Sequence, residues 1–260
     1  MRRIQFTFRV LIVAIFLLPL SACSLPEGIL SILQGATKQD LPTAEVLFKV
    51  VLRQPLQQDT RLMLEVLDDV TGLYFNATRF ELTRDEDLHY SVRIPMSVTT
   101  EVKYRYIRVG DGTEYEFDSR QQQVRYRILK VNGPEIILDH IAGWINDPYD
   151  ERSGRISGQV IDQANNAPIP NILVAAGGMQ TVTTSDGTFV LTGLMPGVHN
   201  LVLYSMDGAY DTFQQGALVA EGANTPVNVF LTKRPVTEVT FSVKVPGDFD
   251  SSIPLRLVTN

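Results

Sequence analysis

Short runs in which apolar and polar residues alternate dominate two blocks of this sequence. In Glu45–Leu52 every second residue is apolar, so that Val46, Phe48 and Val50 fall on one face of an extended chain. Turn-forming residues such as Gly110-Asp111-Gly112 separate the runs. Neither block contains a helix-forming stretch of useful length. The pattern therefore predicts an all-β fold of tandem antiparallel β-sandwich modules, immunoglobulin-like or transthyretin-like.

The N-terminal segment has the features of an export signal. Basic residues up to Arg9 precede the apolar run Val10–Leu20, which is too short to span a bilayer. Leu20-Ser21-Ala22-Cys23 then resembles the bacterial lipobox. The resemblance implies cleavage before Cys23, a lipid on its sulfur, and an exported lipoprotein anchored in a membrane at the cell surface or outer membrane. An ordinary secretory peptide followed by a stray cysteine is the alternative.

Charge and cysteine content limit the partners and the sources of stability. The leader holds three arginines and no acidic residue, so its removal would change the net charge from −6 to −9. Such an acidic chain is a poor match for a nucleic acid. Cys23 is the only cysteine, so no disulfide can form within the chain. Stability must come from the cores of the sheets.

Breaks in the pattern divide the chain into six segments. Asn132-Gly133-Pro134 and Asn146-Asp147-Pro148 interrupt the strand-like runs. Between them, the apolar residues of Ile136–Leu138 and Trp144 are expected to pack back onto the first sandwich and close it. The expected segments are a signal peptide (1–22), a lipid-anchored tether (23–42), a first sandwich (43–131), a connector (132–153), a second sandwich (154–232) and a C-terminal piece (233–260).

The first sandwich resembles a starch-binding module of the family-20 kind. The resemblance rests on the order of three segments: Val46–Val50, Leu82–Pro95 and Glu101–Tyr106, followed by Tyr115-Glu116 where the family usually has Trp-Glu. It implies carbohydrate binding, of an α-glucan-like polysaccharide. The expected sugar contacts are Tyr115 by stacking, Glu116 and Lys103 by hydrogen bonds, and Tyr74. The family's tryptophan platform and its L-G-x-W loop are missing. A packed Tyr115 and a solvated Glu116 are the alternative.

The second sandwich resembles the carboxypeptidase regulatory-like domain. The segments that carry this resemblance are Gly154–Asp162, Ala167–Val174, Thr184–Phe189 and Gly193–Leu201. Ser185-Asp186-Gly187 suits a tight turn, because glycine readily adopts a positive φ. These residues shape turns and provide no evident chemistry.

The C-terminal piece repeats the start of the first sandwich. Glu238–Val245 matches Glu45–Leu52 without a gap. We therefore expect an incomplete second copy of the first module, or a chance similarity between two strand-like segments. Two strands alone cannot bury a core.

The sequence contains no motif of a catalytic or metal site. His89, His140 and His199 lie far apart, and no metalloprotease, hydrolase or phosphate-binding motif is present. We therefore expect no enzyme activity and no cofactor or metal in these residues. The predicted function is a surface lipoprotein with carbohydrate-binding accessory modules. The alternatives are the accessory part of a larger glycoside hydrolase, and a structural surface spacer or adhesion protein.

Overall fold

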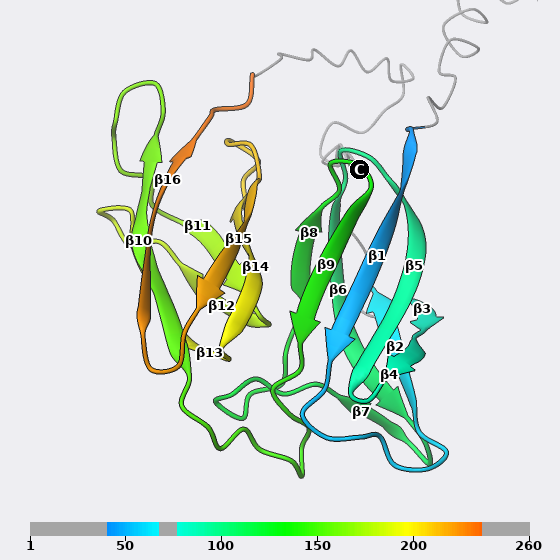
Figure 1. Ribbon diagram of the computed structural model, residues 1–260. Helices are drawn as coiled ribbons and strands as arrows, with labels where there is room; N and C mark the ends of the chain where they lie inside the picture. The colour runs from blue at the N-terminus through cyan, green and yellow to red at the C-terminus, as the bar shows by residue number, and fades with distance from the viewer. Residues whose placement is uncertain (1–40, 68–76, 236–260) are drawn as a thin grey trace, which may run out of the picture. The chain divides into compact units, whose positions relative to one another are not determined.

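The computed structural model describes residues 41–67 and 77–235. These residues form β-strands and connecting segments, and they contain no helix (Figure 1). The prediction of an all-β chain of tandem β-sandwiches is confirmed. Both sandwiches belong to one compact unit of the chain. The signal peptide, Cys23, Tyr74 and the repeat at Glu238–Val245 lie outside the described residues.

Two sheets form the first sandwich. One has the strand order β4-β5-β1-β9 and the other the order β3-β2-β6-β7, with β8 also paired to β6. The strands are β1 (Thr43–Val51), β2 (Arg61–Val66), β3 (Thr78–Glu81), β4 (Thr83–Glu86), β5 (His89–Ser97), β6 (Glu101–Val109), β7 (Thr113–Tyr115), β8 (Arg127–Lys130) and β9 (Glu135–His140).

The alternation in the sequence fixes which face of β1 enters the core. Val46, Phe48 and Val50 are buried between the two sheets, and the residues between them point outward. Opposite them, Tyr104 and Tyr106 of β6 fill the core. The Phe48 and Tyr104 rings meet edge to face, with their centroids 5.1 Å apart.

The connector predicted at 132–153 contributes a strand to the first sandwich. β9 pairs with β1 in parallel, from Val46 opposite Glu135 to Val51 opposite His140. Ile137 and Trp144 are buried in the core of the first sandwich, whereas Ile136 is 64% exposed. The first sandwich therefore extends beyond residue 131.

The second sandwich also consists of two sheets. Their strand orders are β13-β10-β16 and β12-β11-β14-β15. The strands are β10 (Gly154–Asp162), β11 (Ile172–Ala176), β12 (Met179–Val182), β13 (Thr188–Leu194), β14 (Gly197–Ser205), β15 (Phe213–Val219) and β16 (Asn224–Leu231).

The last strand of the second sandwich pairs with its first strand. β16 runs parallel to β10, from Arg155 opposite Asn224 to Asp162 opposite Leu231. The turn expected at Ser185-Asp186-Gly187 is present: Gly187 has φ 72° and its N–H donates to the carbonyl of Thr184. After this turn Phe189 re-enters the core.

Candidate functional site

The residues expected to bind sugar do not form one surface. Tyr115 ends β7, and adjacent residues of an extended chain point to opposite faces of a sheet, so Glu116 points away from Tyr115. Lys103 lies on β6, whereas Tyr115 pairs with Ile107, which is four residues further along β6. This separation is about 13 Å.

Each of these side chains already contacts another group. The Arg105 guanidinium lies 4.3 Å from the centre of the half-buried Tyr115 ring. Lys103 Nζ lies 5.7 Å from the centre of the Tyr126 ring. Glu116 is 1% exposed, and its carboxylate accepts hydrogen bonds inside the first sandwich. A sugar hydroxyl therefore does not reach Glu116 in this structure.

Arg127 is the centre of a buried ionic network. It lies on β8 and is 4% exposed. Its Nη2 is 2.8 Å from Glu116 Oε2 and its Nη1 is 3.0 Å from Asp139 Oδ1 on β9. Nη2 also donates to the carbonyl of His140. One guanidinium thus joins β8, β9 and the segment after β7.

Two tyrosines complete the network from β6. Their hydroxyls donate to Asp139 Oδ2, at 2.8 Å from Tyr104 and 2.9 Å from Tyr106. Burial and the Asp139 carboxylate raise the pKa of both tyrosines well above the ordinary value. Burial alone would lower the pKa of Arg127, but its carboxylate neighbours outweigh that effect and raise it. The members of the network are therefore bonded to one another, which suits a structural role better than proton transfer.

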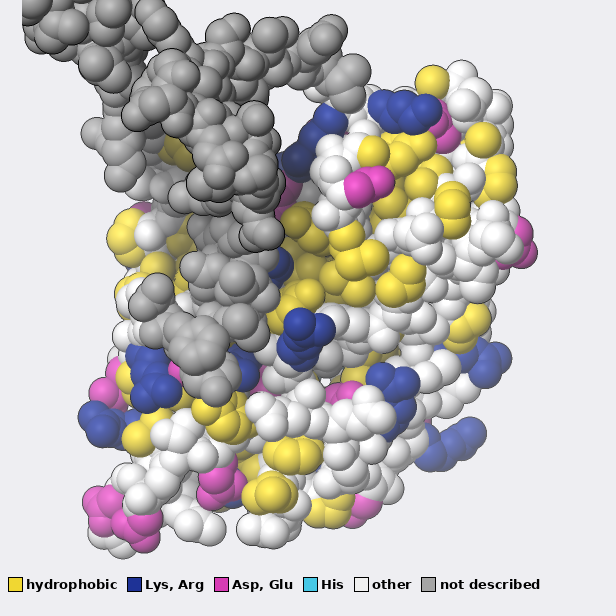
Figure 2. Space-filling model, turned by 180° about the vertical axis from the view of Figure 1, so that it is seen from behind, with side chains coloured by type: hydrophobic (Ala, Val, Ile, Leu, Met, Phe, Trp, Pro, Cys, Tyr) yellow, Lys and Arg dark blue, Asp and Glu magenta, His cyan; other side chains and the backbone are white. Residues whose placement is uncertain are grey.

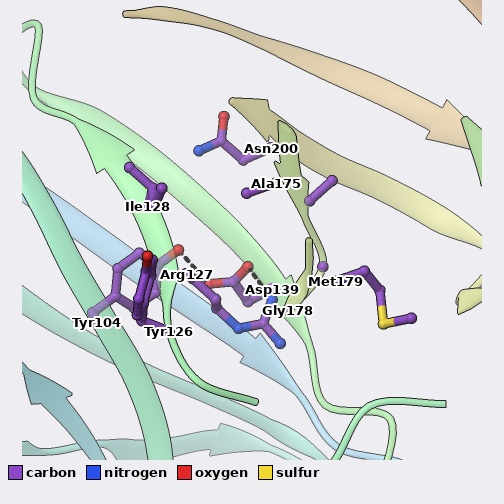
Figure 3. Close-up of a pocket in the computed structure, with 11 residues that line it drawn as sticks. Tyr104, Tyr126, Arg127, Ile128, Asp139, Ala175, Gly178, Met179 and Asn200 are labelled. Atoms are coloured by element: carbon purple, nitrogen blue, oxygen red, sulfur yellow. Dashed lines mark hydrogen bonds and ion pairs between the residues drawn. The ribbon is translucent and has the colours of Figure 1, made fainter. Parts of the chain in front are cut away.

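The network borders the contact between the two sandwiches. A cavity of about 10 Å³ lies beside it, and Figure 3 shows side chains of both sandwiches around this cavity. A space of this size holds one water molecule at most. It is too small for a substrate.

Apolar side chains from both sandwiches pack together at this contact. A buried cluster combines Ile128 of β8 with Leu173, Ala175 and Val202 of β11 and β14. Polar contacts surround it. These are Lys130 N to Gln214 Oε1 (2.9 Å), Gln180 Nε2 to the Tyr126 carbonyl (2.7 Å), Ser119 Oγ to the Gly193 carbonyl (2.6 Å) and Arg234 Nη2 to Glu101 Oε1 (2.7 Å).

Glycines of the second sandwich allow this close approach. Gly178, in the turn between β11 and β12, has φ 81°, and a Cβ there would lie 2.9 Å from Val124 Cγ2. Gly193 has φ 83°, and its Cβ would lie 2.7 Å from Ser119 Oγ. Both positions combine a left-handed backbone with a close contact to the first sandwich. A larger residue is therefore disfavoured by its backbone conformation and also by steric overlap.

A histidine pair lies at the same contact. The rings of His140 on β9 and His199 on β14 have centroids 5.8 Å apart. His199 Nε2 lies 2.7 Å from the Met195 carbonyl, whereas buried His140 Nε2 has no hydrogen-bond partner within the described protein. Burial and the neighbouring His199 lower the pKa of His140 to about 4, and burial also lowers the pKa of His199.

A polar hollow lies elsewhere on the first sandwich. It has a volume of about 270 Å³ and lies between the segment before β2 and the β6–β7 turn. Its lining includes Gln57, Gln58, Asp59, Arg108 and Glu114. Amides and carboxylates of this kind can bond to hydroxyl groups.

Residues 41–67 and 77–235 contain no group of three or more His, Cys, Asp or Glu side chains placed to hold a metal ion. Within the same ranges no helix is long and apolar enough to cross a membrane. Described Lys and Arg side chains on the face in Figure 2 lie scattered among acidic and apolar ones.

Comparison with known families identifies one of the two sandwiches. Residues 155–232 match the family model of the carboxypeptidase regulatory-like domain. The second sandwich is a carboxypeptidase regulatory-like domain. The sequence resemblance predicted this, and its residues 154–232 agree closely with the matched range. The match covers less than half of the chain, so it assigns the regulatory-like domain and not the first sandwich.

Other comparisons gave weaker similarity. No curated protein matches the chain. Similar solved structures include the minor pilin GBS52 of Streptococcus agalactiae, at 11% identity and TM-score 0.28, covering 75% of this chain and 99% of that chain. A shaft pilin SpaA from Lactobacillus rhamnosus GG has 9% identity and TM-score 0.27, with coverage of 75% and 100%. At these TM-scores the similarity gives no support for a shared function.

Sequence reasoning missed the ionic network and the glycine contact. Arg127 falls in the predicted first sandwich and Asp139 in the predicted connector, where the sequence assigns neither a role, and Glu116 is predicted to bind sugar. One signal was present: Asp139 directly follows the apolar run Ile136–Leu138, where a charge needs a buried partner.

Proposed function

We propose that this chain is a non-catalytic spacer at the cell surface, in which the two sandwiches form one stiff unit held to the membrane by a lipid on Cys23. The observation that carries the proposal is the packed contact between the first sandwich and the regulatory-like domain. Domains joined only by a linker move independently by default. Here an apolar cluster, side-chain hydrogen bonds and close glycine contacts oppose such motion.

The buried network supports a structural role for the first sandwich. The two carboxylates of the network, Glu116 and Asp139, are both bonded to Arg127, so neither is positioned as a general base. Arg127 also lies next to the contact, because its Nη2 would be 3.6 Å from a Cβ at Gly178. The network therefore stiffens the surface on which the regulatory-like domain rests.

Rotational diffusion of the two sandwiches tests the proposal. At pH 7, NMR relaxation should give both sandwiches the same rotational correlation time. Gly178→Val should separate the two values, because the new side chain would overlap Val124. Gly208→Val is the matched control, since Gly208 also has a positive φ (71°) but a Cβ there would meet nothing within 4 Å. Independent tumbling of the wild-type sandwiches would contradict the proposal.

The membrane attachment needs its own test, because Cys23 lies outside the described residues. In the producing bacterium, the wild type should incorporate labelled palmitate and sediment with membranes. One acyl chain binds only marginally, whereas two or more hold a protein firmly. Cys23→Ala should lose the label, and Ser24→Ala should keep it. Equal labelling of Cys23→Ala would exclude the lipid anchor.

Carbohydrate binding is the second candidate function. The polar hollow favours it, because its amides and carboxylates can bond to the hydroxyl groups of a sugar. If an α-glucan binds in this hollow, Gln57→Ala and Glu114→Ala should each weaken binding of maltoheptaose by roughly 5- to 150-fold, the effect of a lost contact of about 1–3 kcal/mol. Gln215→Ala, on β15, is the control. Calorimetry that detects no binding by the wild type would remove this candidate.

A further inference from the structure

The first and last strands of each sandwich are neighbours, and they run in the same direction. In the first sandwich the pair is β1 and β9, and in the regulatory-like domain it is β10 and β16. The chain therefore enters each sandwich at one end of this ladder and leaves it at the other end. A pull on the two ends of a sandwich acts along the two strands in opposite directions.

This geometry decides how the hydrogen bonds carry a load. In a parallel ladder the bonds are evenly spaced along the strands. When the strands are pulled past one another, all bonds of the ladder are strained together. When the same strands are separated from one end, the bonds break one after another. Shear therefore needs a much larger force than peeling, although the ladder is the same.

We propose that the chain is a load-bearing element, in which the β1/β9 and β10/β16 ladders resist tension between the membrane-proximal end and the C-terminal end. The source of the tension rests on the proposed surface role, whereas the resistance follows from the fold alone. Tension runs from β1 across its ladder to β9, through the connector to β10, and across the second ladder to β16. The strands between each pair stay outside this path while the ladders hold.

Additional contacts extend the second ladder at both of its ends. The N–H of Arg155 donates to the Ala223 carbonyl at 3.0 Å, and the N–H of Gln163 donates to the Leu231 carbonyl at 3.0 Å. Lys233 Nζ lies 3.2 Å from Asp162 Oδ2. These contacts must also yield before β16 slides along β10.

Comparable contacts reinforce the first ladder. Arg53, just after β1, donates to the carbonyls of Ala142 and Pro148, which follow β9. Asp139, within β9, is held by Arg127 of β8. A relative displacement of β1 and β9 would break both sets of contacts.

Pulling single molecules in two directions tests the proposal on the regulatory-like domain. The full chain would carry Cys23→Ser and two attachment cysteines. Arg152→Cys with Pro235→Cys loads β10 and β16 in shear. Arg152→Cys with Glu221→Cys peels β10 from β16, because these two residues lie at the same end of the ladder. Arg152 Nε is 4.0 Å from Glu221 Oε1. Circular dichroism and thermal unfolding would establish that both variants are equally folded before they are pulled.

At the same loading rate, the shear pair should unfold at a force at least twice that of the peeling pair. Equal forces, or a stronger peeling pair, would overturn the proposal. The first sandwich provides a second comparison should one pair fail to fold: Pro42→Cys with Ile145→Cys for shear, and Pro42→Cys with Pro134→Cys for peeling. Neither comparison depends on whether the two sandwiches tumble together. The load-bearing proposal can therefore fail while the proposed spacer function holds, and the reverse is also true.

Discussion

At the scale of single residues, the first sandwich depends on one arginine. Arg127 forms ion pairs with two carboxylates that are almost completely buried. Removing one partner of a buried ionic group leaves the others charged and unpaired, which costs far more than the pair contributes. The same reasoning explains why both tyrosine hydroxyls point to Asp139.

Replacement of Arg127 should therefore be severe. We expect Arg127→Met to lower the free energy of unfolding by about 3–5 kcal/mol, because Glu116 and Asp139 lose their counterion. Arg125→Met is the control, since Arg125 is exposed two residues away and its loss should change the free energy by under about 0.5 kcal/mol. Guanidinium unfolding measures both. A loss below about 1 kcal/mol for Arg127→Met would mean that the two carboxylates find other partners or water.

At the scale of elements, β9 is the strand that completes the first sandwich. Its neighbouring isoleucines have opposite environments: Ile137 belongs to the core, and Ile136 faces outward. This alternation follows from the two-residue period of a strand. The alternation fixes the face of β9 that enters the core, and the pairing from Val46 opposite Glu135 to Val51 opposite His140 gives its register against β1.

The two isoleucines provide a matched test of that register. Ile137→Ala should lower the free energy of unfolding by about 2–4 kcal/mol, because it removes buried methyl groups and leaves a cavity. Ile136→Ala should change it by less than about 0.5 kcal/mol. Urea denaturation of both variants gives the comparison. Equal losses would contradict the register of β9.

The sequence predicted elements better than it predicted contacts. Alternation in Glu45–Leu52 was enough to place β1, because burial on one face is a local property of a strand. β9 was harder to predict, since Ile136–Leu138 is a continuous apolar run with no visible period. Glu116 was misleading for a different reason. Its partner Arg127 is brought to it by pairing of β6 with both β7 and β8, and no local pattern records that pairing.

At the scale of the whole molecule, the contact between the sandwiches contains the His140–His199 pair. Arg127 on β8 opposes a charge on either ring, and Asp139 on β9 favours one. The exposed His89 contributes a further small repulsion to His140. The pair therefore makes the contact sensitive to acid.

The direction of this effect follows from the lowered pKa values. An opened or unfolded form, with ordinary histidines near 6.5, binds protons more strongly than the packed form. Stability of the contact is therefore full above about pH 6.5, and it falls as the pH approaches 4, the pKa of His140. The melting temperature of the wild type should decrease over this window.

Variants separate this effect from general acid unfolding. His140→Gln and His199→Gln together should make the melting temperature less dependent on pH between 6.5 and 4. His89→Gln, on the exposed side of β5, should change this dependence much less, because His89 affects the pKa of His140 less than burial or His199 does. Thermal scans at several pH values measure all three proteins. A double variant with the wild-type slope would assign the acid sensitivity to carboxylates instead.

The parallel pairing of first and last strands also has a consequence for synthesis. A chain that emerges N-terminus first exposes β1 long before β9, and at roughly 5–20 residues per second several seconds pass before β9 follows. During that interval one edge of β1 has no partner strand, and it can pair with a neighbouring nascent chain. The first sandwich thus closes late, and the regulatory-like domain closes only after β16 has emerged. Until β9 and β16 have emerged, the edges of β1 and β10 that they later cover are therefore the places where association between nascent chains can start.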